Sequence, residues 1–164
     1  MNSFDNYLRD LIKKYPVNLN YNNNEFLNNK LEVINSLKSL TNEHSCSKHS
    51  KILEILNYKV QDTNVKILDF GCGGGVPLVL LKMAGYNNIN GVDLQNLHIN
   101  KIQKQQYFSN MFGFEDNTFS YINNNKTNFD DNNFDIVISL QVLEHVKNFK
   151  LYYDEISRVL KNDG

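Results

Sequence analysis

The chain has 164 residues, of which 41% are hydrophobic and 21% are charged, and its formal net charge at pH 7 is -1. This length is enough for one hydrophobic core, and the composition excludes a wholly disordered chain. The nearly balanced charge gives no sign of a polyanion-binding surface, so we expect no nucleic-acid partner. Two cysteines, with no signal peptide and no long apolar span, are typical of a reduced cytoplasmic protein, and we expect no membrane partner.

Three amphipathic helices are predicted near the start of the chain. Apolar residues recur at helical spacing over residues 3–15, 25–40 and 47–56, and polar linkers separate them. We therefore assign residues 1–60 to an N-terminal helical cap and residues 61–164 to a second domain. His44, Cys46 and His49 lie close together in the sequence but match no zinc spacing, so we predict no metal site.

Short strands and helices alternate after Asn57. Apolar runs predict strands over 66–69, 89–93, 119–122 and 134–140, and helical spacing predicts helices over 77–84, 97–112 and 149–160. Pro77 suits the first turn of a helix, and Gly85 suits a helix C-terminus. This alternation predicts a Rossmann-like α/β fold, with a doubly wound, mainly parallel sheet covered on both faces. Ligands of such sheets bind at the carboxyl ends of the strands.

A turn rich in glycine follows the first of these strands. Asp69 ends the strand, and Gly71, Gly73 and Gly75 let the backbone bend tightly and come close to a ligand. A second acid, Asp93, ends the next strand, where a carboxylate can accept hydrogen bonds from both hydroxyls of an adenosine ribose. A turn or a helix N-cap is the alternative role for Asp93. The two acids in equivalent places predict one nucleoside site.

The glycine spacing separates the classes of nucleotide ligand. The dinucleotide pattern G-x-G-x-x-G fails because Val76 or Leu78 stands in the third glycine position, depending on whether the count begins at Gly71 or Gly73. No Gly-Lys-Ser or Gly-Lys-Thr follows, which excludes a Walker A loop. The pattern that fits is Asp-x-Gly-x-Gly-x-Gly. A nicotinamide-dependent oxidoreductase is therefore the less favoured interpretation.

Five segments resemble, in order, the motifs of the class I S-adenosylmethionine-dependent methyltransferases. They are residues 65–75, 91–94, 133–139, 143–146 and 158–164. The resemblance covers Val65 to Gly164 and implies the first four strands of a seven-stranded sheet, with the order three-two-one-four-five-seven-six. It also implies a C-terminally truncated, incomplete S-adenosylmethionine-binding domain. The fourth strand would then be an exposed sheet edge, which favours self-association.

The resemblance assigns roles to individual residues of the cofactor site. The implied cofactor-binding residues are Asp69, Gly71, Cys72, Gly73, Gly75, Asp93, Leu94, Asn123 and Leu140. Asp69 would face the methionyl ammonium, Asp93 would hold the ribose hydroxyls, and Leu94 would press on the adenine. Asn123 stands where the family usually has an acid, and its carbonyl can still accept a hydrogen bond from the adenine amino group. Leu140 would flank the methionyl end.

The implied function is the transfer of a methyl group from S-adenosylmethionine to an oxygen or nitrogen of a small-molecule acceptor. Residues 71–75 and 143–146 resemble those of the ubiquinone-pathway O-methyltransferases. His145 is a candidate general base, although packing beside the cofactor site is the favoured interpretation, because orientation alone can supply much of the rate. The alternative function is a catalytically silent fragment, or a partner subunit, that binds S-adenosylmethionine or S-adenosylhomocysteine.

Overall fold

The computed structural model describes residues 51–52, 55–56, 60, 62–94 and 99–164. The predicted helices over 3–15 and 25–40 and the cysteine–histidine triplet lie outside the described residues, as does most of the predicted cap. Within the third predicted helix, residues 51–52 and 55–56 are helical.

Strands and helices alternate along the described chain. Their order is β1 (Ile67–Phe70), α4 (Val76–Met83), β2 (Ile89–Leu94), α5 (Ile99–Phe112), β3 (Phe119–Ile122), β4 (Ile136–Ile138), the 3-10 helix η1 (Leu143–His145) and α6 (Phe149–Val159). The four strands form one parallel sheet with the order β3-β2-β1-β4. This confirms the predicted Rossmann-like α/β fold and the predicted order of its first four strands.

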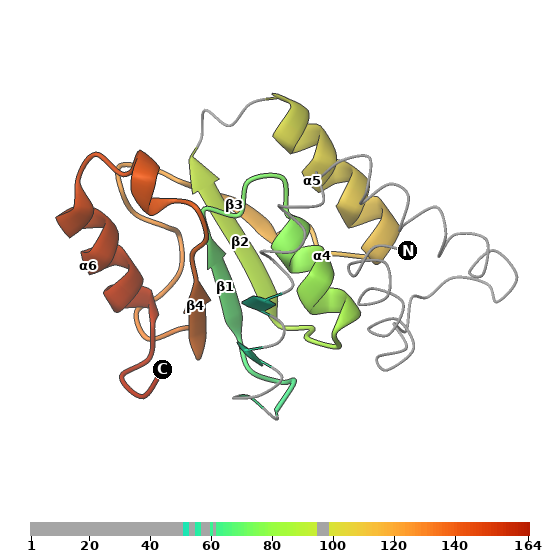
Figure 1. Cartoon of the computed structure of the whole chain (residues 1–164), viewed down its shortest axis with the longest axis horizontal. Helices are drawn as coiled ribbons and strands as arrows, with labels where there is room; N and C mark the ends of the chain where they lie inside the picture. Colours follow the sequence, from blue (N-terminus) through green and yellow to red (C-terminus); the bar gives the residue numbers. More distant parts are fainter. Residues whose placement is uncertain (1–50, 53–54, 57–59, 61, 95–98) are drawn as a thin grey trace, which may run out of the picture.

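Helices cover both faces of the sheet (Figure 1). Helices α4 and α5 lie on one face, and α6 lies on the other. Side chains of β1 alternate between the two cores, because Ile67 packs with the α4 and α5 residues, whereas Leu68 and Phe70 pack with Val92 and Val159. A strand that is buried on both faces needs apolar residues at consecutive positions, which explains why Ile67 and Leu68 are both apolar.

The glycine turn leads directly into α4. Gly75 is the N-cap of this helix, with a φ of 85°, and Pro77 lies in the first turn as predicted. At the other end, Ala84 is the C-cap and Gly85 follows with a φ of 96°. Helix α4 thus begins one residue earlier than the sequence predicts, and it presents its N-terminus at the carboxyl end of β1.

The fourth strand is shorter than predicted. It comprises only Ile136–Ile138, because the backbone of Phe134 pairs elsewhere. The Phe134 N–H donates to Val159 O at 2.9 Å, and the Lys161 N–H donates to Phe134 O at 2.9 Å, which makes a parallel bridge to Leu160. The segment after α6 therefore lies beside the amino end of β4. Among the described strands, β4 lies at one edge of the sheet.

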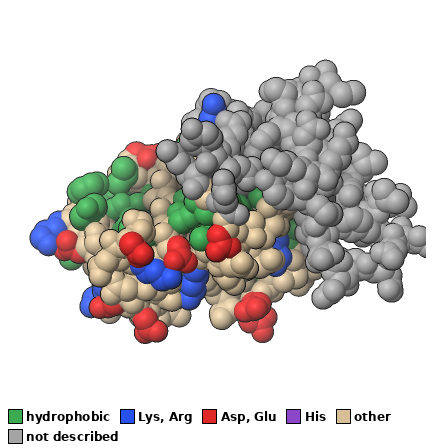
Figure 2. Space-filling model, turned by 90° about the horizontal axis from the view of Figure 1, so that it is seen from below, with side chains coloured by type: hydrophobic (Ala, Val, Ile, Leu, Met, Phe, Trp, Pro, Cys, Tyr) green, Lys and Arg blue, Asp and Glu red, His purple; other side chains and the backbone are tan. Residues whose placement is uncertain are grey.

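Charges of both signs are interspersed on the face of the molecule that Figure 2 shows. Ion pairs in the described part include Arg158 with Asp131 and Lys161 with Asp135, each at 2.6 Å. None of the helices in the described ranges combines the length and the apolar composition that crossing a bilayer requires. The expected lack of a nucleic-acid partner stays a prediction.

Candidate functional site

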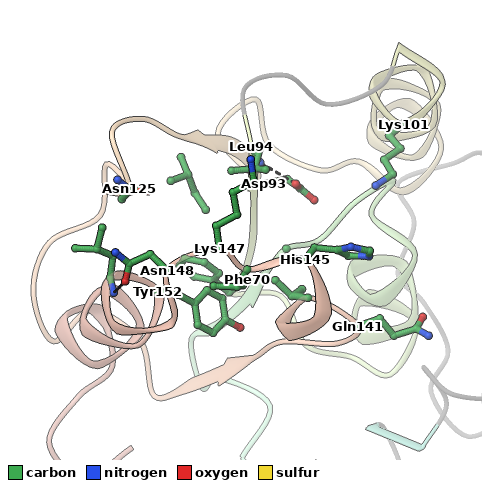
Figure 3. A pocket seen from close by; sticks show the side chains of 15 residues that line it. Phe70, Asp93, Leu94, Lys101, Asn125, Gln141, His145, Lys147, Asn148 and Tyr152 are labelled. Carbon is green, nitrogen blue, oxygen red and sulfur yellow. Dashed lines mark hydrogen bonds between the residues drawn. The ribbon is translucent and has the colours of Figure 1, made fainter.

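A pocket of about 590 Å³ opens at the carboxyl ends of the strands. Phe70 and Gly71 contribute its wall at the end of β1, and Asp93 and Leu94 contribute the wall at the end of β2. The other walls come from α5, from the loop after β3, from the segment that contains η1 and from the first turn of α6 (Figure 3). This is the edge of the sheet at which the sequence predicts a ligand.

The glycine turn requires glycine for two reasons. Gly71, Gly73 and Gly75 all have positive φ values, of 91°, 54° and 85°. A Cβ on Gly71 would also lie 2.3 Å from Cγ2 of Val142, and one on Gly75 would lie 2.7 Å from the ring of Phe119. Residues with a side chain rarely adopt a positive φ, and a Cβ at Gly71 or Gly75 would overlap the neighbouring side chain. The predicted tight turn is therefore confirmed.

Asp93 connects the glycine turn to the end of β2. Its Oδ2 accepts a hydrogen bond from the Gly73 N–H at 2.7 Å, and its Oδ1 accepts one from the Leu94 N–H at 2.7 Å. A carboxylate has about four acceptor positions, so each oxygen keeps one for a ligand. Asp93 is partly exposed and lines the pocket beside Leu94, whose side chain is 57% exposed. The turn role and the ribose role of Asp93 are therefore compatible.

Asp69 lies buried at the end of β1 and does not line the pocket. Asp69 is 1% exposed, and its Oδ2 has no hydrogen-bond partner in the described part of the chain. Burial, and secondarily the charge of Asp93, raise the pKa of Asp69 to about 8. A buried carboxyl oxygen without a partner is unfavourable, and a ligand ammonium group would supply the missing donor. The chemistry of this position fits the predicted role.

Cys72 and Leu140 are also outside the pocket wall. Cys72 is 4% exposed, and a Cβ on Gly91 would lie 2.8 Å from its Sγ, so its side chain points into the core. Burial raises the pKa of its thiol, and the charges of Asp69 and Asp93 add to this effect. Cys72 therefore offers backbone rather than side-chain contacts. After β4, Gln141 and Val142 line the pocket instead of Leu140.

The loop after β3 places Asn125, rather than Asn123, on the pocket wall. Asn123 forms two backbone hydrogen bonds of 2.9 Å with Lys126, which close a tight turn. Asn124 and Asn125 inside this turn have φ values of 49° and 63°. Asparagine tolerates this left-handed conformation better than most residues. The turn therefore rotates the third asparagine toward the pocket.

His145 belongs to η1 and lines the pocket with an exposed side chain. No other residue in the described ranges forms a hydrogen bond with its imidazole. A general base needs an orienting partner or a substrate proton within reach, and His145 shows no such partner here. Its role as a base stays a prediction.

Two polar residues that support the site were not predicted. Gln105 of α5 is 4% exposed, and its Nε2 donates to Gly73 O at 2.6 Å, so it holds the carbonyl of the residue whose N–H donates to Asp93. Tyr152 of α6 lines the pocket, and its hydroxyl donates to Ser139 Oγ at 2.5 Å. A detectable signal for Gln105 was its place on the apolar face of its helix, three residues before the buried Phe108.

No group of three or more His, Cys, Asp or Glu side chains that could hold a metal ion occurs within the described ranges. The fold and the site together define a Rossmann-like domain with its crevice at the carboxyl ends of the strands. Residues 68–164, more than half of the chain, match the family described as the methyltransferase domain. The chain belongs to this family.

Two methyltransferases are similar to this chain over part of their length. The mitochondrial ubiquinone biosynthesis O-methyltransferase of Dictyostelium discoideum is 28% identical over 125 residues, which cover 68% of this chain and 39% of that protein. The sterol 24-C-methyltransferase of Kluyveromyces lactis is 33% identical over 104 residues, which cover 62% of this chain and 27% of that protein. The chain thus spans less than two fifths of the length of these relatives.

A similar solved structure is that of the PH0226 protein from Pyrococcus horikoshii. It matches with a TM-score of 0.61 and 27% identity, and the match covers 76% of this chain and 57% of that chain. The same fold therefore extends over most of the part of the chain that the structure describes.

Proposed function

We propose that this chain is an S-adenosylmethionine-dependent methyltransferase domain that transfers a methyl group to an oxygen or nitrogen of a small molecule. The observation that carries the proposal is the 2.7 Å hydrogen bond from the Gly73 N–H to Asp93 Oδ2. This bond joins the glycine turn to the carboxylate for the ribose at the sheet edge where the pocket opens, although Gly73 itself does not line the pocket. Membership of the methyltransferase domain family supports the reaction type.

Each part of the cofactor has a candidate position in the site. Asp93 would accept hydrogen bonds from the ribose hydroxyls, and Leu94 would give the adenine an apolar contact. Asn125 offers an amide group on the pocket wall, and the buried Oδ2 of Asp69 suits an ammonium group. S-adenosylmethionine supplies a methyl group on a positively charged sulfur, which is electrophilic without further activation.

The rest of the pocket suits a small organic acceptor. Phe70 and Tyr152 pack edge to face, with ring centroids 5.2 Å apart, and Leu151 extends this apolar wall. The hydroxyl of Ser139 donates to Phe70 O at 2.8 Å and accepts from Tyr152, which holds the tyrosine ring in place. An apolar wall of fixed shape orients an acceptor and excludes water, and such positioning can provide a large part of the rate.

The O-methyltransferase relatives favour an oxygen acceptor within this proposal. The relative named for sterol 24-C-methylation acts on carbon according to its name, so the family resemblance does not select the acceptor atom. We keep the cytoplasmic location and the small-molecule partner, both expected from the sequence, as parts of the proposal.

Isothermal titration calorimetry with S-adenosylhomocysteine tests the proposal. The unmodified chain should bind, and Asp93→Ala should bind at least about a hundredfold more weakly, because the ribose acceptor and the bond to Gly73 are both lost. Asp116→Ala is the matched control, since Asp116 is an exposed acid before β3 and does not line the pocket.

A methyl-transfer assay with a panel of phenols and amines completes the test. Binding without turnover on any acceptor would favour a silent cofactor-binding domain. A chain that binds no S-adenosyl nucleoside would contradict both functions.

A further inference from the structure

A lysine without a partner in the described part of the chain points into the pocket beside the glycine turn. Lys101 lies in the first turn of α5, is exposed, and extends from this helix toward the pocket (Figure 3). Its Nζ lies 3.8 Å from the position that a Cβ on Gly73 would occupy. No residue in the described ranges forms a hydrogen bond or an ion pair with this ammonium group.

Most other lysines of the described part have partners. Lys66 donates to Asn133 and Lys82 to Asn87, while Lys150 pairs with Asp154 and Lys161 with Asp135. Lys126 and Lys147 also show no side-chain partner among the described residues, and Lys147 lines the same pocket. Lys101 differs from the paired lysines because it lines the pocket, and its Nζ lies beside Gly73 of the turn that would approach the cofactor.

The backbone of the glycine turn has few N–H groups left for an anion. The N–H groups of Gly71 and Cys72 donate to Val92 O, that of Gly73 donates to Asp93 Oδ2, and that of Gly75 donates to Cys72 O. Pro77, in the first turn of α4, has no N–H group. Glycine turns that bind anions use such groups as donors. Among these residues only Gly74 and Val76 keep an N–H group without a described acceptor, so a side-chain donor would add to the binding of an anion at this turn.

The charges around the turn make a cation there more important. Asp69 and Asp93 both lie close to the turn, and burial, with a smaller effect from the charge of Asp93, raises the pKa of Asp69. A ligand carboxylate would be repelled by the Asp93 carboxylate unless a positive group lay beside it. The positive charge of Lys101 is close enough to lower the pKa of Cys72, against the larger effects of burial and of the two acids.

We propose that Lys101 binds the carboxylate at the amino-acid end of S-adenosylmethionine. This inference rests on the proposed function, and it adds a residue that none of the recognised motifs contains. Asp69 would then receive the ammonium group, and Lys101 the carboxylate, of the same amino acid. The site recognises a zwitterion with two groups of opposite charge that come from different elements, β1 and α5.

Two ligands that differ only in this carboxylate provide the test. S-adenosylhomocysteine carries it, and S-adenosyl-3-thiopropylamine lacks it. Calorimetry should show that Lys101→Met weakens S-adenosylhomocysteine binding about tenfold, because one charge-assisted contact in a partly exposed pocket is lost. The same variant should change the affinity for the amine by less than about twofold. Lys101→Arg should restore most of the affinity for S-adenosylhomocysteine.

Lys82→Met is the matched control, because Lys82 lies in the last turn of α4 and does not line the pocket. It should leave both affinities unchanged. In the unmodified chain, added salt should weaken S-adenosylhomocysteine binding more than it does in Lys101→Met, since salt screens the lost charge interaction.

Equal weakening of both ligands by Lys101→Met would overturn the inference, because a general disturbance of the pocket would then explain the loss. An unchanged affinity for S-adenosylhomocysteine would also overturn it, and would point to His145 or to the amides of Gly74 and Val76 as the carboxylate donors. In both cases the unmodified chain still binds, so the proposed function stands. Absence of binding by the unmodified chain would contradict the proposed function and this inference together.

Discussion

Replacing Asp69 by asparagine should make the ligand-free protein more stable at neutral pH. Burial, together with the charge of Asp93, raises the pKa of Asp69 from 3.8 to about 8. At pH 7 the unfolded chain has therefore lost a proton that the native protein keeps. A difference of one unit between the pKa and the pH corresponds to about 1.4 kcal/mol. The unfolded-state pKa of 3.8 lies about 3 units below pH 7, so keeping Asp69 protonated at pH 7 costs the native state about 4 kcal/mol.

The sign of this effect follows from proton binding. Between pH 4 and pH 8, approximately, the native state binds more protons at this residue than the unfolded state does. The contribution of Asp69 to stability is thus complete below its unfolded pKa, and it is lost as the pH rises through the folded value. The asparagine side chain of the Asp69→Asn variant cannot titrate, so the comparison of the two proteins isolates the effect of this one group.

Urea unfolding of both proteins at a series of pH values measures the effect. We expect the free energy of unfolding of the unmodified chain, relative to Asp69→Asn, to fall by about 3 kcal/mol between about pH 5 and pH 7. Asp116→Asn, which removes an exposed acid, controls for the change in net charge. A difference between the unmodified chain and Asp69→Asn that does not vary with pH would refute the reasoning.

Three further substitutions test the glycine turn, its contact with Gln105, and an ion pair between Glu155 and Arg158 of α6. Gly71→Ala should destabilise the fold by about 3 kcal/mol in urea unfolding, because it combines a positive φ with a valine carbon 2.3 Å away, and an unchanged midpoint would contradict this. Gln105→Leu should weaken S-adenosylhomocysteine binding about tenfold by releasing the glycine turn, whereas the exposed Gln106→Leu should not, and equal effects would disprove the positioning role. Glu155→Gln should cost about 3 kcal/mol at neutral pH, because it breaks a buried pair with Arg158. Burial opposes the ionised form of Glu155, but its hydrogen bonds outweigh burial and lower its pKa. The loss of stability in Glu155→Gln should therefore shrink as the pH falls through this lowered pKa. A loss that stays constant with pH in urea unfolding would argue against the ion pair.

Much of the sheet could be predicted from the sequence, because its determinants are local. The strand at 119–122 was predicted with the bounds that the structure shows. The strand order was implied by the resemblance to the methyltransferase family, and the structure shows the same order for the first four strands. The fourth strand was predicted too long, because the pairing of Phe134 with Leu160 joins residues far apart in the sequence. Apolar composition does not report such a pairing.

The candidate site was also predicted only in those features that depend on local sequence. The positive φ values of the glycine turn and the place of Asp93 follow from residue type and spacing. Asn125 lines the pocket in place of the predicted Asn123, because Asn124 and Asn125 adopt left-handed conformations in the turn. Three asparagines in a row do not indicate which of them faces the pocket. Gln105 was missed because its partner is a backbone carbonyl on another element, which no sequence motif records.

A crystal structure of the chain with S-adenosylhomocysteine would show directly whether Asp93 binds the ribose. We expect the ribose hydroxyls within hydrogen-bond distance of the Asp93 carboxylate, with the adenine against Leu94 and the amino-acid end beside the glycine turn. A nucleoside bound elsewhere, with Asp93 contacting only Gly73 and Leu94, would contradict this expectation.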